Sequence, residues 1–124
     1  MKQSDFEIAC AVVQASGDSP GKERLLTFLA HSERLHNGTM TELHSVGPDA
    51  ANVTLFHDKL VQLRATLQPV HELLMEMEVG VRDMRFERQV SWDMADAVGK
   101  VLHMQSHELN GLLWALSHKR HSTA

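Results

Sequence analysis

The chain has 124 residues, a length that is typical of one domain. Hydrophobic residues make up 43% and charged residues 23% of it, which excludes a disordered chain. The formal net charge is −4 and no stretch concentrates Lys and Arg, so direct binding to DNA or RNA is disfavoured. Cys10 is the single cysteine, which excludes an intrachain disulfide framework. We expect one domain over residues 1–124.

The distribution of apolar residues bears on where the protein resides. The longest apolar runs contain only a few residues, far fewer than the ~20 that span a bilayer. The amino terminus lacks the basic, apolar and small-residue regions of a signal peptide. We therefore expect a cytoplasmic protein that makes no contact with a membrane.

Turn-forming residues divide the first half of the chain into short elements. Ser4 and Glu7 have the spacing of a capping box, and the apolar residues that follow predict a helix over about 4–15. Ser19-Pro20 has the residue types that begin a helix, and an apolar stripe then continues to Asn37-Gly38. Because Asn and Gly commonly end helices, we expect the second helix to stop there.

The clearest pattern begins at Asp49, where apolar residues recur every seven positions in two series. The first series is Val53, Leu60, Leu67, Leu74 and Val81, and the second is Phe56, Leu63, Val70, Met77 and Met84. This seam predicts a long helix from residue 49 to about 78. Pro69 lies inside it, and we expect a kink there without loss of the seam.

The heptad pattern fails after residue 84 and restarts in another frame. The new series are Ala95, Leu102, Leu109 and Leu116, and Val98, Gln105 and Leu112. A turn between about 78 and 93 explains the shift, with a last helix over about 83–118 folded back antiparallel. The residues expected to be buried between the two helices are Leu60, Leu63, Leu67, Val98, Leu102, Leu109 and Leu112.

The predicted fold class is all-α. Tyr is absent and alternating β-branched runs are missing, so strands have almost no support. We expect a helical bundle with two short amino-terminal helices and a long antiparallel carboxy-terminal hairpin. Gln105 interrupts the seam with a polar side chain, and such interruptions can fix the register of a helical pair.

The nine histidines are the first candidates for metal-binding and catalytic groups. His103 and His107 are four residues apart on one helical face, and His31 or His57 would have to supply a third ligand. The chain lacks an HExxH motif and a repeated ExxH motif, so we expect no metal site and no cofactor. Cys10 has no histidine near it in sequence and is expected to be a packed thiol. We predict no catalytic residues and no enzymatic activity.

One short string suggests an alternative function. Ser106-His107-Glu108-Leu109 resembles the opening of the phosphoacceptor box of sensor histidine kinases, although only four residues match. In that family the histidine lies exposed on a helical hairpin. The resemblance implies a histidine phosphotransfer hairpin as one alternative.

The large apolar side chains suggest an interaction surface. Met77 and Met84 lie on the seam, where we expect them to fill the core. Trp92 and Trp114 lie off the seam, where an aromatic side chain either anchors an interface or caps the first two helices. Because the apolar surface exceeds what two short helices can cover, we also expect a homodimer.

The last predicted helix resembles that of a known family. Leu102-His103, Gln105, Leu109-Asn110, Leu112-Leu113 and Leu116 resemble the carboxy-terminal helix of TraM-type quorum-sensing antiactivators in order and spacing. The resemblance implies a small helical protein that sequesters a LuxR-type transcription factor and prevents its DNA binding. The pattern departs from that family at Trp114 and in the basic tail that follows. We expect the partner-binding residues to be Trp92, Leu113, Trp114 and Leu116.

A second class stays open because short chains with an amphipathic last helix have other uses. This helix also looks like that of the inner-rod subunits of type III secretion systems, whose amino-terminal half is typically disordered. The cap at Ser4 and the apolar stripes of the first two helices favour the regulator over the rod subunit.

Overall fold

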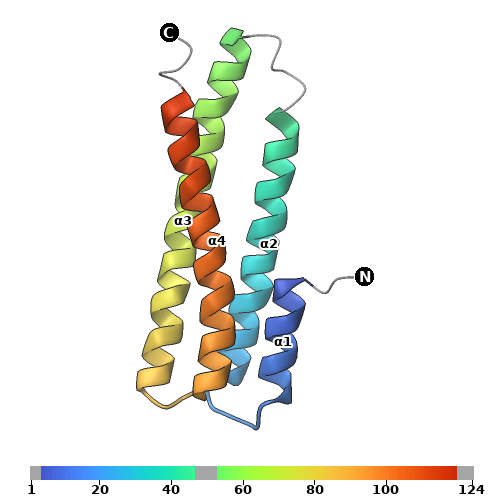
Figure 1. Ribbon diagram of the computed structural model, residues 1–124, viewed down its shortest axis with the longest axis vertical. Coiled ribbons are helices and arrows are strands. Elements are labelled where there is room, and N and C mark those ends of the chain that lie inside the picture. Colours follow the sequence, from blue (N-terminus) through green and yellow to red (C-terminus); the bar gives the residue numbers. More distant parts are fainter. Residues whose placement is uncertain (1–3, 47–52, 120–124) are drawn as a thin grey trace.

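The chain folds into long helices that pack side by side as a bundle (Figure 1). The computed structural model describes residues 4–46 and 53–119, and it describes the backbone alone for 44–46, 53–57 and 116–119. The helices are α1 (Asp5–Ala15), α2 (Lys22–Val46), α3 (Val53–Phe86) and α4 (Trp92–Lys119). These residues contain no strand, so the predicted all-α fold class is confirmed. Within the same ranges, no helix is both long enough and apolar enough to pass through a membrane.

The antiparallel pair of α3 and α4 contains most of the hydrophobic core. The buried side chains of the two helices include Leu63, Leu67, Leu74, Met77, Val81, Met84, Val98, Leu102 and Leu109. Leu60 and Leu112, near the far end of the pair, are only half-buried. The predicted seam is confirmed from Leu63 onward, and Met77 and Met84 fill the core as expected. The side chains of its first members, Val53 and Phe56, lie outside the described residues.

Helix α3 continues through its internal proline. Pro69 lacks an N–H, so the carbonyl of Ala65 has no helical donor. Both residues are exposed, and water can bond that carbonyl. Leu67 and Leu74 are buried on either side, so the seam persists across Pro69 as predicted.

The predicted end of the second helix at Asn37-Gly38 is wrong. Helix α2 continues for two more turns to Val46 and has 25 residues, so it is not a short helix. Among the described glycines none has a positive φ, and Gly38 therefore keeps a helical backbone. Leu43 packs against the core beyond that point, and we attribute the continuation to this contact, because a glycine in a helix costs only ~1 kcal/mol.

The boundaries of the hairpin also differ from the prediction. Helix α3 ends at Phe86 instead of near residue 78, and α4 begins at Trp92 instead of near 83. The connection at 87–91 lies inside the predicted window of 78–93. Helix α3 continues because Val81 and Met84 still face the core.

An unusual residue closes the end of α3. Arg88 has a φ of 59°, the left-handed conformation in which glycine is the usual residue. The N–H of Arg88 donates to the carbonyl of Arg85 at 3.1 Å, and that of Gln89 donates to the carbonyl of Met84 at 2.9 Å. These two bonds form a Schellman motif, and no glycine in the sequence marks its position.

The start of α2 is bound to this same turn. The N–H of Gly21 donates to the carbonyl of Gln89 at 2.9 Å. A Cβ at Gly21 would lie 2.8 Å from Val90 Cγ1 and 3.2 Å from the Gln89 carbonyl. The close approach of α2 to the turn therefore depends on glycine at this position.

Helix α1 packs between α2 and α4 but is much shorter than either (Figure 1). Its predicted cap is confirmed, because the Ser4 hydroxyl accepts a hydrogen bond from the Glu7 N–H at 3.2 Å. Ala9 and Val13 are buried against the neighbouring helices. Helices α2 and α4 both extend beyond the amino-terminal end of α1 (Figure 1).

Replacing Gly21 by alanine should destabilise the bundle. The added Cβ must displace Val90 or the backbone of Gln89, and overpacking of this kind costs about 1–3 kcal/mol. Urea unfolding followed by circular dichroism measures the loss. Gly17→Ala is the control, since a Cβ there meets nothing within 4 Å. Equal stability of the two variants would contradict the packing described.

Arg88→Gly should have the opposite effect. It removes the strain of a left-handed non-glycine residue and should raise the free energy of unfolding by ~1 kcal/mol. The same substitution at Arg82, which is exposed in the interior of α3, should lower the free energy of unfolding by ~1 kcal/mol. Loss of stability in Arg88→Gly would show that the turn does not have this conformation in solution.

Candidate protein-binding site

Large apolar side chains remain exposed on several helices. Among the described residues they are Ile8, Val12, Met40, Val61, Met75, Val79, Phe86, Trp92, Met104 and Trp114. Met75, Val79 and Phe86 share one face of α3, because their spacings of four and seven residues return to the same side of a helix. The homodimer expected from uncovered apolar surface stays a prediction.

Three side chains form an aromatic corner where α3 turns into α4. Arg85, Phe86 and Trp92 make up this corner. The Arg85 guanidinium lies 4.3 Å from the centroid of the Trp92 ring and 5.8 Å from that of Phe86. The two aromatic residues are 74% and 67% exposed, respectively, so both rings are presented to solvent. Cation–π contacts therefore join the guanidinium to each ring without burying either ring.

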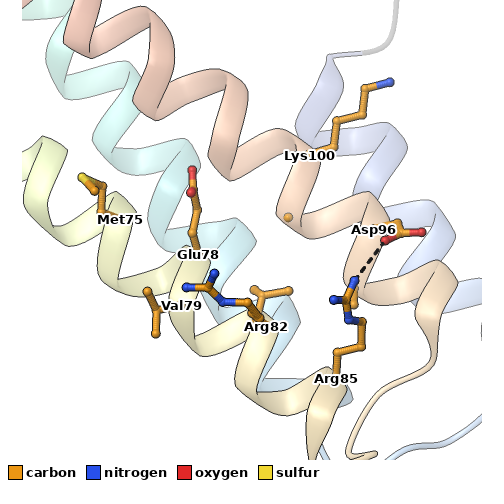
Figure 2. Close-up of a pocket in the computed structure, with 10 residues that line it drawn as sticks. Met75, Glu78, Val79, Arg82, Arg85, Asp96 and Lys100 are labelled. Atoms are coloured by element: carbon orange, nitrogen blue, oxygen red, sulfur yellow. Dashed lines mark ion pairs between the residues drawn. The ribbon is translucent and has the colours of Figure 1, made fainter.

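A groove between α3 and α4 leads away from this corner (Figure 2). Its volume is about 350 Å³, and Met75 and Val79 line one side. Gly99 lines the α4 side, where a Cβ would meet only Val81 Cγ1 at 3.9 Å. Arg85 lines the groove and also contacts the two rings, so the α3–α4 groove and the aromatic corner form one continuous surface.

The charges of the α3–α4 groove are unevenly paired. Arg85 Nη1 lies 3.9 Å from Asp96 Oδ1, the ion pair drawn in Figure 2. Glu78 Oε1 accepts a 2.7 Å hydrogen bond from the buried Ser106 hydroxyl. Arg82 and Lys100 also line the groove and make no ion pair within the described part of the chain. The groove thus combines an apolar side with basic groups that are available to a partner.

The four predicted partner-binding residues do not form one surface. Trp92 belongs to the aromatic corner, whereas Trp114 is 62% exposed at the other end of α4. They are 22 positions apart in the sequence, which corresponds to about 33 Å of helix. Leu113 is only 7% exposed and belongs to the core. Leu116 lies on α4, but its side chain is outside the described residues.

Sequence reasoning did not identify the α3 side of the surface. Met75, Val79 and Phe86 lie off the heptad seam yet share a helical face. Their spacing could have predicted an apolar surface on this helix outside the core. Arg85 had no comparable signal, because its contact with Trp92 requires the exact position of the turn.

The histidines and the cysteine have other surroundings. The His103 and His107 rings lie nearly parallel with centroids 6.3 Å apart, and His103 Nδ1 lies 3.6 Å from Glu78 Oε1. Within the described ranges, no group of three or more His, Cys, Asp or Glu residues is arranged to hold a metal ion. Cys10 is half-buried and packs against the core, as expected for a structural thiol.

Comparisons of the chain with protein-family models, with curated proteins and with solved structures found no match.

Neighbouring residues near the end of α4 should respond differently to truncation. Leu113→Ala should lower the free energy of unfolding by about 2–5 kcal/mol, because it opens a cavity in the core. Trp114→Ala should change it by less than ~1 kcal/mol, because most of that side chain is in water. Chemical denaturation of both variants checks this. A Trp114→Ala protein that fails to fold would instead place Trp114 in the core.

Proposed function

We propose that this protein is a protein-binding regulator that sequesters a LuxR-type transcription factor and prevents its DNA binding. The transcription factor is proposed from the resemblance of α4 to TraM-type antiactivators. Binding through a surface, without chemistry, is supported by the aromatic corner described above. The proposed partner-binding surface consists of this corner and the adjoining α3–α4 groove.

The exposure of Phe86 and Trp92 is the observation that carries the proposal. Each ring leaves well over half of its surface in water, although both are among the most apolar side chains of the protein. Aromatic and arginine residues dominate the binding energy of protein interfaces. Arg85 holds the rings on the rigid ends of two helices, so little conformational entropy is lost when a partner covers them.

The order of the amino-terminal half supports the regulator over the inner-rod subunit. Helix α1 buries Ala9 and Val13, and α2 buries Leu25 and Leu29 in the same core. A rod subunit of the kind considered above would have a disordered amino-terminal half.

Truncation of the aromatic corner tests the function. Trp92→Ala should weaken binding to the regulator by ~2 kcal/mol or more, which is about thirtyfold in Kd, and should restore promoter binding in an electrophoretic mobility-shift assay. The free energy of unfolding of Trp92→Ala should differ from that of the wild type by less than ~1 kcal/mol, because the Trp92 side chain is exposed. Val61→Ala is the control, since Val61 is an exposed apolar residue of α3 outside this surface. Full inhibition by a folded Phe86→Ala/Trp92→Ala protein would refute this surface.

A second candidate function, histidine phosphotransfer, is favoured by the surroundings of His107. This imidazole is exposed in the middle of α4. One turn further on, a Cβ at Gly111 would meet nothing within 4 Å, so the surface beside the ring is open to another protein. An exposed imidazole on a rigid helix can accept a phosphoryl group from a donor that leaves with the bond electrons.

Labelling with phosphoramidate distinguishes this candidate. If it holds, the wild type should acquire one acid-labile phosphate per chain, and His107→Gln should acquire none. His71→Gln is the control, since His71 is a half-buried histidine of α3. Equal labelling of the wild type and His107→Gln would eliminate the phosphotransfer function.

A further inference from the structure

A second recognition surface lies where α2 and α4 extend beyond α1. The residues that line it define the upper α2–α4 cleft: His36, Thr39, Met40, Leu43, Gln105, Glu108, Leu109 and Leu112. The cleft has a volume of about 250 Å³ and is mostly apolar. Phe6 marks its lower limit, because the ring of this first-turn residue of α1 packs 5.6 Å from the ring of His36. Figure 1 shows α2 and α4 continuing above the amino-terminal end of α1.

Helix α1 shows what kind of element fits between α2 and α4. It packs through Phe6, Ala9, Cys10 and Val13, whose spacing of three, four and seven residues is that of one helical face. The α2 residues that line the upper cleft run from His36 to Leu43, about two turns of helix. An amphipathic helix of about two to three turns therefore has the shape to occupy it.

The charges around the upper cleft select the chemistry of the occupant. The adjoining hollow at the start of α1 is lined by four carboxylates, Asp5, Glu7, Glu33 and Glu108, and by no Lys or Arg. Glu108 also lines the upper cleft itself. An acidic rim beside an apolar floor attracts a helix that carries basic residues next to its apolar face.

We propose that the upper α2–α4 cleft binds a basic amphipathic helix of a partner protein. The proposal rests on the proposed function in so far as the occupant belongs to a partner, but it uses a surface separate from the aromatic corner. Gln105 lines the floor, and its buried Oε1 has no hydrogen-bond partner in the described part of the chain. The Nε2 of the same side chain donates to the Ser32 carbonyl at 2.9 Å, which holds the amide in place.

A second copy of this chain is a poorer occupant. The helix that already fits this interface is α1, and its first turn carries Asp5 and Glu7. Helix α1 contains no Lys or Arg, so a second α1 lacks the basic residues that would pair with Glu33 and Glu108 on the rim.

The test measures binding of a designed peptide by fluorescence anisotropy. The probe is a labelled helical peptide of ~14 residues, long enough to cover the cleft and to form a helix. It has leucines at i, i+3, i+4 and i+7 and lysines beside them. A matched peptide replaces every lysine by glutamate. The lysine peptide should bind at least ~tenfold more tightly than the glutamate peptide, and the difference should shrink in high salt.

Protein variants then locate the binding site. Met40→Asp places a charge on the apolar floor at an exposed residue, and should weaken binding of the lysine peptide at least ~tenfold. Glu33→Lys/Glu108→Lys should reverse the preference between the two peptides. The matched controls are Met75→Asp and Glu72→Lys/Glu76→Lys, which make the same changes at exposed positions of α3 and should leave binding unchanged.

Three results would overturn the proposal. One is failure of the wild type to bind the lysine peptide, and another is binding that neither cleft variant weakens. The third is a dimer in sedimentation velocity that Met40→Asp converts to monomer, which would make a second copy the occupant.

This experiment is independent of the proposed regulator function. Trp92→Ala should bind the lysine peptide as the wild type does, since the aromatic corner is not part of the cleft. If the wild type does not bind the lysine peptide but still inhibits the regulator, the cleft proposal is refuted and the regulator function is not. Peptide binding without any effect on a LuxR-type regulator refutes the partner proposed above and leaves the cleft supported.

Discussion

Burial of the apolar seam between α3 and α4 is the constraint on which the remaining structure depends. Leu67, Leu74 and Leu102 are almost completely removed from water by this contact. Neither helix would be stable alone, because most helical stability in proteins comes from packing of an apolar face. Helices α1 and α2 pack on the sides of the pair, and the bond from Gly21 to Gln89 joins α2 to its turn.

The aromatic corner is a consequence of how this pair reverses direction. The left-handed Arg88 ends α3 abruptly, so Phe86 and Trp92 lie on either side of a short connection and outside the seam. Arg85 can then reach both rings and still form its ion pair with Asp96. A recognition surface on helix ends is more rigid than one on a long loop, which reduces the entropic cost of binding.

The unequal lengths of the helices create the second surface. Because α1 has 11 residues and α2 has 25, part of the α2–α4 interface has no cover from α1. The two surfaces differ in charge, since Arg82 and Lys100 flank the α3–α4 groove whereas Glu33 and Glu108 flank the upper cleft. One small bundle therefore presents two surfaces of opposite charge, and like charges would oppose an exchange of the two proposed partners between them.

The sequence alone determined the helices, the seam and the cap at Ser4, because heptad spacing and capping are properties of a local segment. It did not determine the end of α2, where the packing of Leu43 accompanies a helix that continues past Gly38. It also did not show that Leu113 is buried and Phe86 exposed, since both are simply apolar residues near a predicted helix end. The tertiary structure decided these points, because the exposure of a side chain depends on which neighbouring helix covers it. The uncovered cleft beside α1 likewise follows from the packing of α1 and α2 against α4, which is distant from both in sequence.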